Sequence, residues 1–135
     1  MADPRLVEEL FAGPHPCCLT TLGAAGDPYS VVVWCARDGD RVTVNAAESR
    51  WLENLRRDPR VALVVVDTEN ILRHVSVDGV VAAIVPDTDY AHIDSLSLIY
   101  EGRRYQYSTP EDVPRFRVEI EARRIRTVDI SPPAD

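Results

Sequence analysis

The sequence has 135 residues, of which 45% are hydrophobic and 27% are charged, values that fit one globular domain with a buried core. The net charge of −7 argues against nucleic acid as a main partner, because binding to phosphates needs a surplus of cations. All 15 basic residues are arginine, so the chain has no lysine for Schiff-base chemistry or for a phosphate-binding loop.

The chain carries no pattern for a membrane or for export. Even the run VALVVV ends after six apolar residues, far fewer than a transmembrane helix needs. The N-terminal MADPRLVEEL lacks the charged-then-apolar layout of a signal peptide. We therefore expect a cytoplasmic protein with no membrane partner.

The cysteines do not form a disulfide pattern, because they are three in number and two of them are adjacent. Cys17, Cys18 and Cys35 fall inside apolar strand patterns, so we expect small core residues. Their spacing from His15 fits no zinc site, and no metal is predicted. The glycine-rich, serine-elbow and zinc-helix signatures of common enzymes are also missing.

The first third of the chain predicts a helix followed by a hairpin-rich sheet. Apolar residues at helical spacing predict a helix over residues 4–12, which GPHP ends. CCLTTLG predicts a strand, and a longer strand, YSVVVWCAR, follows the turn AAGDP. Asp38-Gly39 is typical of a tight turn and leads into the strand VTVNA.

The rest of the chain alternates short helices with long strands. A helix is predicted from about Ser49 to Arg57, with Ser49 as its N-cap and Asp58-Pro59 as its end. RVALVVV and LRHVSVDGVVAAIV are the next strands, and Gly79 in the second predicts a bulge. A helix over roughly 87–99 begins at the cap PDTD, and RFRVEI with RIRTVDI supplies a final strand or two.

These elements predict a mainly β fold. About six antiparallel strands and three helices, without a regular strand–helix alternation, favour a small β-barrel with flanking helices. We expect one domain over residues 1–130 and a frayed tail over 131–135. The loop EGRRYQY, which carries tyrosines, either forms a lid over a site or covers one end of the barrel.

The stretch SRWLENLRRDPR is the main candidate for a binding site. A helix that begins at Ser49 offers free backbone N–H groups, and with Arg50 these could hold a phosphate. The alternative is a plain N-cap beside a solvated arginine. Arg56, Arg57 and Arg60 lie at the other end of this helix, where a cation simply stabilises the helix C-terminus.

The sequence from LFAGPHPCCLTTLG through NLRRDPRVALVVVD, and on through RHVSVDGVV, IDSLSLIYEGRRY and RFRVEIEARRI, resembles the pyridoxamine 5′-phosphate oxidase-like superfamily. Within it, the chain is similar to the small actinobacterial flavin- and deazaflavin-dependent oxidoreductases. The resemblance implies a six-stranded split β-barrel that forms a homodimer with shared cofactor sites. It favours a deazaflavin coenzyme, with FMN as the alternative, and a small-molecule substrate.

The resemblance also implies a cofactor site. The ring would lie against the strand around Val32, Val33 and Trp34, and the phosphate tail would reach the loop NAAES and the next helix. Positions matching the tail region are Asn45, Ser49, Arg50 and Asn54, and Arg73 could contribute from a neighbouring strand, either within the same subunit or across the dimer. Trp51 either stacks on the cofactor or packs into the barrel or the dimer interface, and burial is the expectation.

This chain departs from the family at the helix start. Relatives usually carry a lysine where Trp51 stands and often a second basic residue where Glu53 stands. Each lost charge-assisted contact costs about 1.5–3 kcal/mol. Two hypotheses follow. The first is an oxidoreductase that transfers a hydride between the cofactor and a small conjugated substrate. The second is a barrel without turnover, which either binds or sequesters a cofactor or has lost its site.

Overall fold

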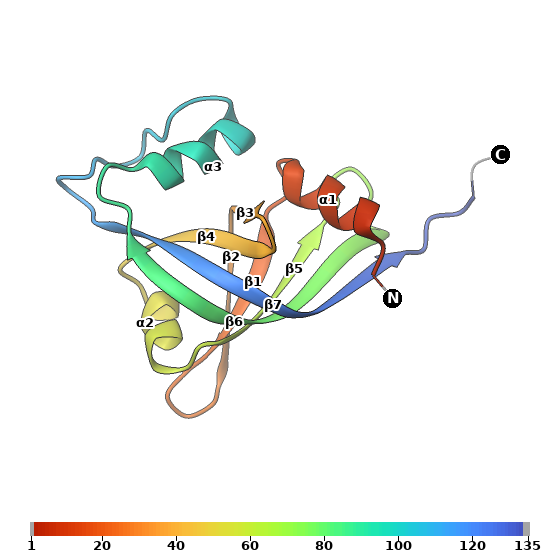
Figure 1. The fold of residues 1–135 in the computed structure, drawn as a ribbon, viewed down its shortest axis with the longest axis horizontal. Helices are drawn as coiled ribbons and strands as arrows, with labels where there is room; N and C mark the ends of the chain where they lie inside the picture. Colours follow the sequence, from red (N-terminus) through yellow and green to blue (C-terminus); the bar gives the residue numbers. More distant parts are fainter. Residues whose placement is uncertain (1, 134–135) are drawn as a thin grey trace.

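The order of the strands determines the shape of the molecule. Residues 2–133, the part of the chain that the computed structural model describes, form one antiparallel sheet of seven strands in the order β2-β1-β5-β6-β7-β4-β3, with three helices (Figure 1). The elements are α1 (Pro4–Ala12), β1 (Cys17–Leu22), β2 (Pro28–Val33), β3 (Cys35–Asp38), β4 (Arg41–Ala47), α2 (Arg50–Arg57), β5 (Arg60–Val66), β6 (Arg73–Pro86), α3 (Ala91–Glu101) and β7 (Arg115–Asp129).

The two edges of this sheet are consecutive in the chain, and only Trp34 separates them. β3 pairs with β4 over Arg41–Val44, so within the described chain the edge of β4 has no strand partner from Asn45 to Ala47. The curled sheet is therefore split along a seam between β2 and the end of β4.

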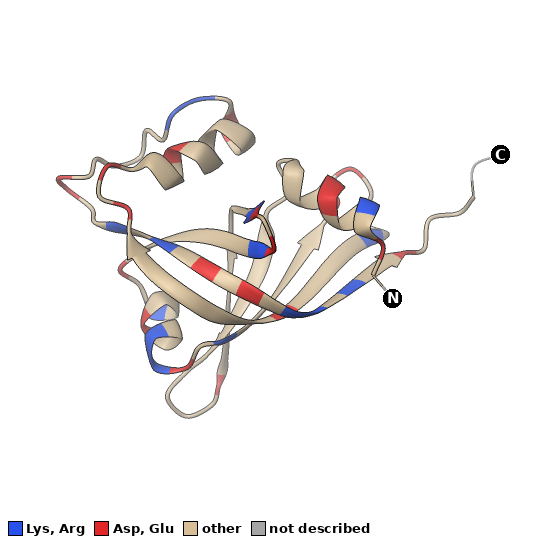
Figure 2. Ribbon diagram, in the orientation of Figure 1, with Lys and Arg blue, Asp and Glu red and all other residues tan. Residues whose placement is uncertain are grey.

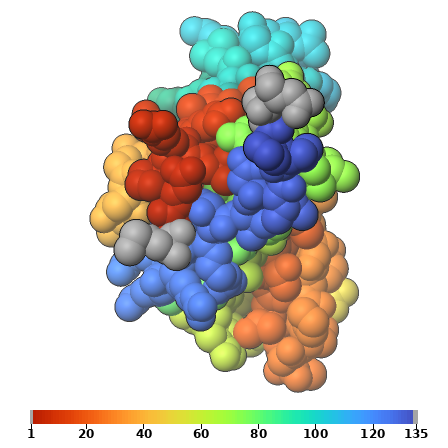
Figure 3. Space-filling view, turned by 90° about the vertical axis from the view of Figure 1, so that its right-hand side faces the viewer, coloured from red at the N-terminus to blue at the C-terminus, as the bar shows by residue number. Residues whose placement is uncertain are grey.

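Alternating apolar residues build the core on the inner face of the sheet. Leu19, Leu63 and Val77 are buried on neighbouring strands, and each fully buried side chain of this kind contributes about 1.5–3 kcal/mol. The apolar side of α1 packs on β3, β5 and β6, whereas α2 packs on β1 and β2. The N-terminus of α1 is tied to β7 by a hydrogen bond from the Asp3 N–H to the Thr127 hydroxyl at 2.9 Å (Figure 3).

The prediction of six strands is wrong, because the expected strand YSVVVWCAR is two strands, β2 and β3. The backbone N–H of Cys35 donates to the Tyr100 hydroxyl at 3.0 Å, and the Trp34 ring stacks on the Tyr100 ring with centroids 5.2 Å apart. A partner from α3 thus interrupts the strand at Trp34. The final segment, by contrast, is the single continuous strand β7.

Most of the local predictions are confirmed. α1 has the predicted bounds, the Asp38-Gly39 turn joins β3 to β4, and the Ser49 hydroxyl caps α2 by accepting from the Leu52 N–H at 3.4 Å. α3 begins at Ala91, four residues later than predicted, because Tyr90 adopts a left-handed conformation with φ 64°.

The ends of the chain add little to the fold. Residues 131–133 form no regular structure, and Ser131 accepts a hydrogen bond from Asn70 at 2.8 Å. The rest of the predicted tail, residues 134–135, lies outside the described residues. Within residues 2–133, no helix has the length and apolar character to cross a bilayer.

Gly79 sits at the predicted bulge, where the register between β6 and β7 shifts. A Cβ at this position would lie 2.7 Å from Ile120 Cγ2 and 2.8 Å from the Glu121 carbonyl oxygen. Because backbone cannot move aside cheaply, we expect Gly79→Ala to lower the free energy of unfolding by about 1–3 kcal/mol in urea titrations. The control Ala82→Ser, exposed on the same strand, should change it by less than about 0.5 kcal/mol. Equal effects of the two substitutions would contradict the steric explanation.

Candidate functional site

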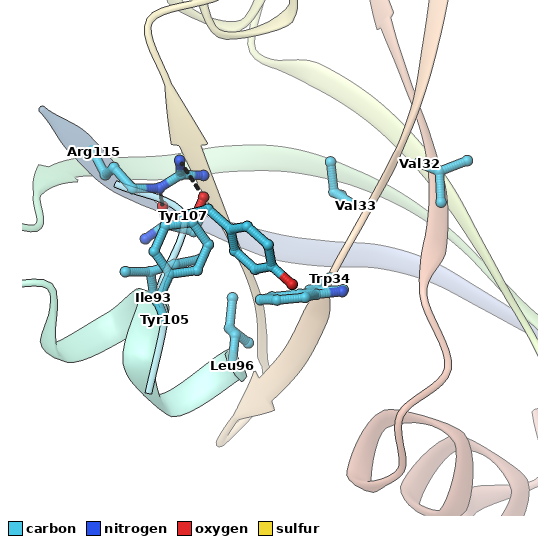
Figure 4. A pocket seen from close by; sticks show the side chains of 9 residues that line it. Val32, Val33, Trp34, Ile93, Leu96, Tyr105, Tyr107 and Arg115 are labelled. Carbon is cyan, nitrogen blue, oxygen red and sulfur yellow. Dashed lines mark hydrogen bonds between the residues drawn. The ribbon is translucent and has the colours of Figure 1, made fainter. Parts of the chain in front are cut away.

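A cleft of about 400 Å³ opens at the seam of the barrel. This volume lies in the range of pockets that bind small molecules. Its walls come from the end of β2, from β4, from α3 and from the loop between α3 and β7 (Figure 4). The lining residues are Val32, Val33, Trp34, Asn45, Ile93, Leu96, Tyr105, Tyr107 and Arg115.

Aromatic rings form one side of this cleft. Trp34 is stacked on Tyr100 and meets the edge of Tyr105 with ring centroids 6.3 Å apart. Tyr105 in turn contacts Tyr107 at 5.2 Å and Tyr90 at 5.9 Å. The segment EGRRYQY therefore supplies a wall of the cleft.

A hydrogen-bonded network forms the opposite, polar side. Asn45 is only 5% exposed, and its amide nitrogen donates to Asp87 Oδ2 at 3.0 Å and to His92 Nδ1 at 2.9 Å. Asp87 also accepts the backbone N–H groups of His92 and Ile93, both at 3.0 Å, and so anchors the first turn of α3. The network joins β4 to α3 underneath the cleft.

Arg115 connects that network to the cleft. Its Nε–H donates to Asn45 Oδ1 at 2.7 Å, and one Nη1–H donates to the Tyr105 hydroxyl at 3.3 Å. The guanidinium also lies over the Tyr105 ring, 5.1 Å from its centroid. Within the described chain, no carboxylate forms an ion pair with Arg115.

The start of α2 lies along the same seam, beyond β4. Arg50 is exposed, with its guanidinium 4.6 Å from the centroid of the Tyr29 ring and 3.5 Å from a carboxylate oxygen of the exposed Asp27. Ser49 uses its hydroxyl as a helix cap. The first turn of a helix leaves backbone N–H groups without intrahelical acceptors, so this corner retains some positive potential.

Two other predicted residues are committed to packing. Trp51 is 8% exposed and belongs to the hydrophobic core, which confirms the expectation of burial. Asn54 is 4% exposed, donates to the Thr21 hydroxyl at 3.0 Å and accepts from Arg57 at 2.9 Å. Its amide therefore joins α2 to β1 and faces neither the cleft nor solvent.

Arg73 does not lie with the other predicted site residues. It is surrounded by carboxylates, at 2.7 Å from Asp67, 2.8 Å from Glu9 and 3.2 Å from Asp129. These partners raise the pKa of Arg73 further above its usual range, the largest contribution being the hydrogen bond with Glu9. Arg73 thus joins α1 to β6 and the end of β7.

Arg56 in the last turn of α2 and Arg60 at the start of β5 are also paired. Arg56 lies 2.8 Å from Glu48 and 3.2 Å from Glu53, and Arg60 lies 2.8 Å from Asp58. The basic stretch of the sequence is therefore not one anion site, because its two ends have different partners.

The structure brings Val32, Val33, Trp34 and Asn45 together, and it adds residues that the sequence did not indicate. Arg115, Ile93 and Leu96 come from segments more than 40 residues away from Asn45 along the chain. Only the tyrosines of the loop gave a sequence signal, as an amphipathic run beside two arginines.

The sequence matches the family model of pyridoxamine 5′-phosphate oxidase over residues 4–129, a span that runs from the first residue of α1 to the last residue of β7. The chain belongs to this family. The resemblance seen in the sequence and the split-barrel fold of this pyridoxamine 5′-phosphate oxidase-like protein are thereby confirmed.

Solved structures support this placement. One described as an F420 reductase is 26% identical, with a TM-score of 0.80, and the match covers 88% of this chain and 94% of that chain. The conserved hypothetical protein Rv2991 from Mycobacterium tuberculosis is 26% identical, with a TM-score of 0.77 over 100% of this chain and 92% of that chain. An FAD-binding protein from Mesorhizobium loti, 15% identical with a TM-score of 0.66 over 93% and 91% of the two chains, shares the fold. No curated protein sequence matches the chain.

His92 gives this pyridoxamine 5′-phosphate oxidase-like barrel a measurable dependence on pH. Burial, assisted by the nearby Arg117, lowers the pKa of His92 to about 4 from 6.5. Below pH 6.5 the unfolded chain takes up a proton that the folded protein does not accept. Stability should therefore fall as the pH drops from 6.5 to about 4, by at most about 3 kcal/mol.

The substitution His92→Asn tests this assignment, because its side-chain oxygen can replace Nδ1 as the acceptor for Asn45 without titrating. When urea unfolding is measured between pH 7 and pH 4, this variant should lose most of the slope of unfolding free energy against pH that His92 contributes. Ser95→Ala, at an exposed residue of the same helix, removes no titratable group and should keep the wild-type slope. An unchanged slope in His92→Asn would rule out the buried imidazole as its source.

Proposed function

We propose that this protein is an oxidoreductase that binds a flavin-type cofactor at the seam between β2 and β4 and transfers a hydride between it and a small conjugated substrate. The observation that carries the proposal is the 400 Å³ cleft against the edge of β2, in a barrel that shares its fold with an F420 reductase. A flavin-type ring, when bound, supplies the two-electron chemistry that the side chains of this chain lack.

The cleft suits a planar ring. Val33 and Trp34 offer an apolar wall, and Ile93 and Leu96 of α3 face it with further aliphatic surface. Such walls exclude water from a bound ring and leave the polar contacts to a few groups. The chain's part in the reaction is to bind the ring, to orient the substrate against it and to keep bulk water out.

The start of α2 suits an anionic tail in part. Arg50 competes only with the exposed Asp27, and an exposed ion pair of this kind is worth little. Trp51 and Asn54, however, are buried and hold α2 in place. Binding of a phosphate therefore depends on Arg50 and on the backbone N–H groups in the first turn of α2.

The deazaflavin coenzyme is the favoured cofactor, and FMN is the alternative. F420 is a deazaflavin, and the F420 reductase matches this chain at 26% identity, against 15% for the FAD-binding protein. We also propose a cytoplasmic homodimer that shares its cofactor sites across the interface.

An apolar row on the outer face of the sheet supports the dimer. Cys18 pairs in register with Val32 on one side and with Val64 on the other, and Val32 is 72% exposed. Val32 also lines the cleft, so a second subunit on this face would complete the wall of the site.

A non-catalytic barrel is the second candidate, and Trp51 is the observation that favours it. Its ring fills core volume at the position where relatives carry a lysine, and Glu53 beside it pairs with Arg56 at 3.2 Å. Tight binding of a cofactor without reduction of any acceptor would favour this candidate.

Titration with each cofactor tests the proposed binding. The purified protein should quench the fluorescence of the deazaflavin coenzyme or of FMN with a micromolar dissociation constant. Arg50→Gln should weaken that binding about tenfold to a hundredfold, because it removes a charge-assisted contact. Arg60→Gln, whose arginine pairs with Asp58 at the far end of α2, serves as the matched control. If neither cofactor binds at micromolar concentration, the oxidoreductase proposal is wrong.

Sedimentation tests the dimer. At micromolar concentration the wild type should sediment as a dimer, and Val64→Asp should sediment as a monomer with weakened cofactor binding, because it buries a carboxylate in the interface. Ile71→Asp places the same charge at an apolar residue that is 76% exposed outside the row, and it should remain dimeric. A monomeric wild type would remove the shared site.

A further inference from the structure

We propose that Arg115 receives the carboxylate of the substrate, and that the substrate is a planar conjugated acid. This inference rests on the proposed function, in which the cofactor ring lies against β2 and the substrate is oriented against that ring in the same cleft. It starts from an arginine that lines the cleft while, within the described chain, no carboxylate forms an ion pair with it.

The hydrogen-bond capacity of Arg115 is only partly used. A guanidinium has five N–H donors. One of them, on Nε, donates to Asn45, and one on Nη1 donates to Tyr105. The three remaining donors, on Nη1 and Nη2, have no acceptor among the described residues, and two that project side by side match the two oxygens of a carboxylate.

The guanidinium is also held in place before any ligand binds. Asn45 fixes Nε at 2.7 Å and is itself fixed by Asp87, whose carboxylate accepts two backbone N–H groups of α3. The Tyr105 ring supports the flat side of the guanidinium. An arginine ordered in this way loses little side-chain entropy when it binds an anion.

The rest of the cleft selects a flat, apolar body attached to that anion. Trp34, Tyr105 and Tyr107 present aromatic surface, and Ile93 and Leu96 are buried aliphatic residues at the base of α3 (Figure 4). No second arginine lines the cleft within the described chain. One charge beside apolar walls fits a monocarboxylate better than a polyanion.

The charges around Arg115 are mixed, and the arginines nearest to it along the chain form no ion pairs with the acids among them. Eight of the 15 arginines form ion pairs with carboxylates in the described chain, but Arg103, Arg104 and Arg115, in and just after the loop that follows α3, do not (Figure 2). The nearby acids are engaged: Asp94 accepts from the Tyr105 N–H at 2.9 Å, and Glu101 accepts from the Tyr107 hydroxyl at 2.6 Å.

A separate place for the cofactor tail explains why Arg115 serves the substrate. Arg50 stands at the start of α2, beside Tyr29 at the beginning of β2, and does not line the cleft. Arg115 stands at the start of β7, next to α3. A cofactor whose ring lies along β2 and whose tail reaches α2 leaves the guanidinium of Arg115 to a second molecule.

Binding of trans-cinnamate and its neutral analogue cinnamamide to the protein without cofactor, measured by calorimetry, tests the inference. The wild type should bind cinnamate about tenfold to a hundredfold more tightly than cinnamamide, the effect of one charge-assisted pair. Arg115→Gln should bring the two ligands to similar affinity. Arg123→Gln, at an exposed arginine 3.6 Å from Glu121, should behave like the wild type.

The cofactor titrations separate this inference from the proposed function. Arg115→Gln should leave the dissociation constants of the deazaflavin coenzyme and FMN within about twofold of the wild type. If it weakens a cofactor as much as it weakens cinnamate, or if the wild type binds cinnamamide as tightly as cinnamate, the inference is overturned while an oxidoreductase remains possible. If no cofactor binds but cinnamate binding still requires Arg115, the proposed function fails and the acid-binding site stands. The comparison of the two ligands on the wild type holds even if Arg115→Gln fails to fold.

Discussion

Tyr100, near the end of α3, places its hydroxyl 3.0 Å from the backbone N–H of Cys35, where a strand partner would otherwise stand. The same hydroxyl lies 2.9 Å from the carbonyl oxygens of His15 and Cys35, to either of which it can donate its proton. Burial raises the pKa of Tyr100, so the hydroxyl keeps that proton. This one side chain meets the backbone just after the end of β2 and stacks on the Trp34 ring, so it joins α3 to the seam.

Asn45 has a comparable role on the other side of the seam. An asparagine that is 95% buried must find partners for both its amide nitrogen and its oxygen, and it finds them on α3, on β7 and in the loop between β6 and α3. Because a buried polar group that loses a partner is costly, the network fixes the distance between β4 and α3. The cleft is therefore set by two polar anchors, the half-buried Tyr100 and the buried Asn45, whereas its surface is mostly apolar. The arrangement gives a rigid site from elements that are far apart in the sequence.

The sequence predicted those features that depend on residues close together in the chain. The spacing of apolar residues in α1, the cap at Ser49, the Asp38-Gly39 turn and the bulge at Gly79 each depend on a few neighbouring residues. The break at Trp34 involves Tyr100, 66 positions later, and no local sequence pattern predicts it.

The site was hard to predict for the same reason, because its residues also come from distant parts of the sequence. Family resemblance pointed to the edge of β2 and to Asn45, but Arg115 reaches Asn45 only through the pairing of β4 with β7. Arg73, in turn, looked available in the sequence and is occupied by carboxylates from both ends of the chain.

Trp51 and Arg115 together determine where positive charge lies along the seam of this barrel. With tryptophan in the core at the start of α2, the positive charge along the seam comes from Arg50 at one end and from Arg115 at the other. In the described chain Arg50 has one ion-pair partner, the exposed Asp27, and Arg115 has none, whereas Arg56 and Arg73 are each paired with two or more carboxylates. Arg50 is exposed and its pairing with Asp27 is screened by water, whereas Arg115 is half-buried between a ring and an amide. An anion gains more from a fixed, partly desolvated guanidinium than from a mobile, solvated one. A ligand on the α3 side of the cleft, beside Arg115, therefore gains more from a negative group than a ligand beside Arg50 does.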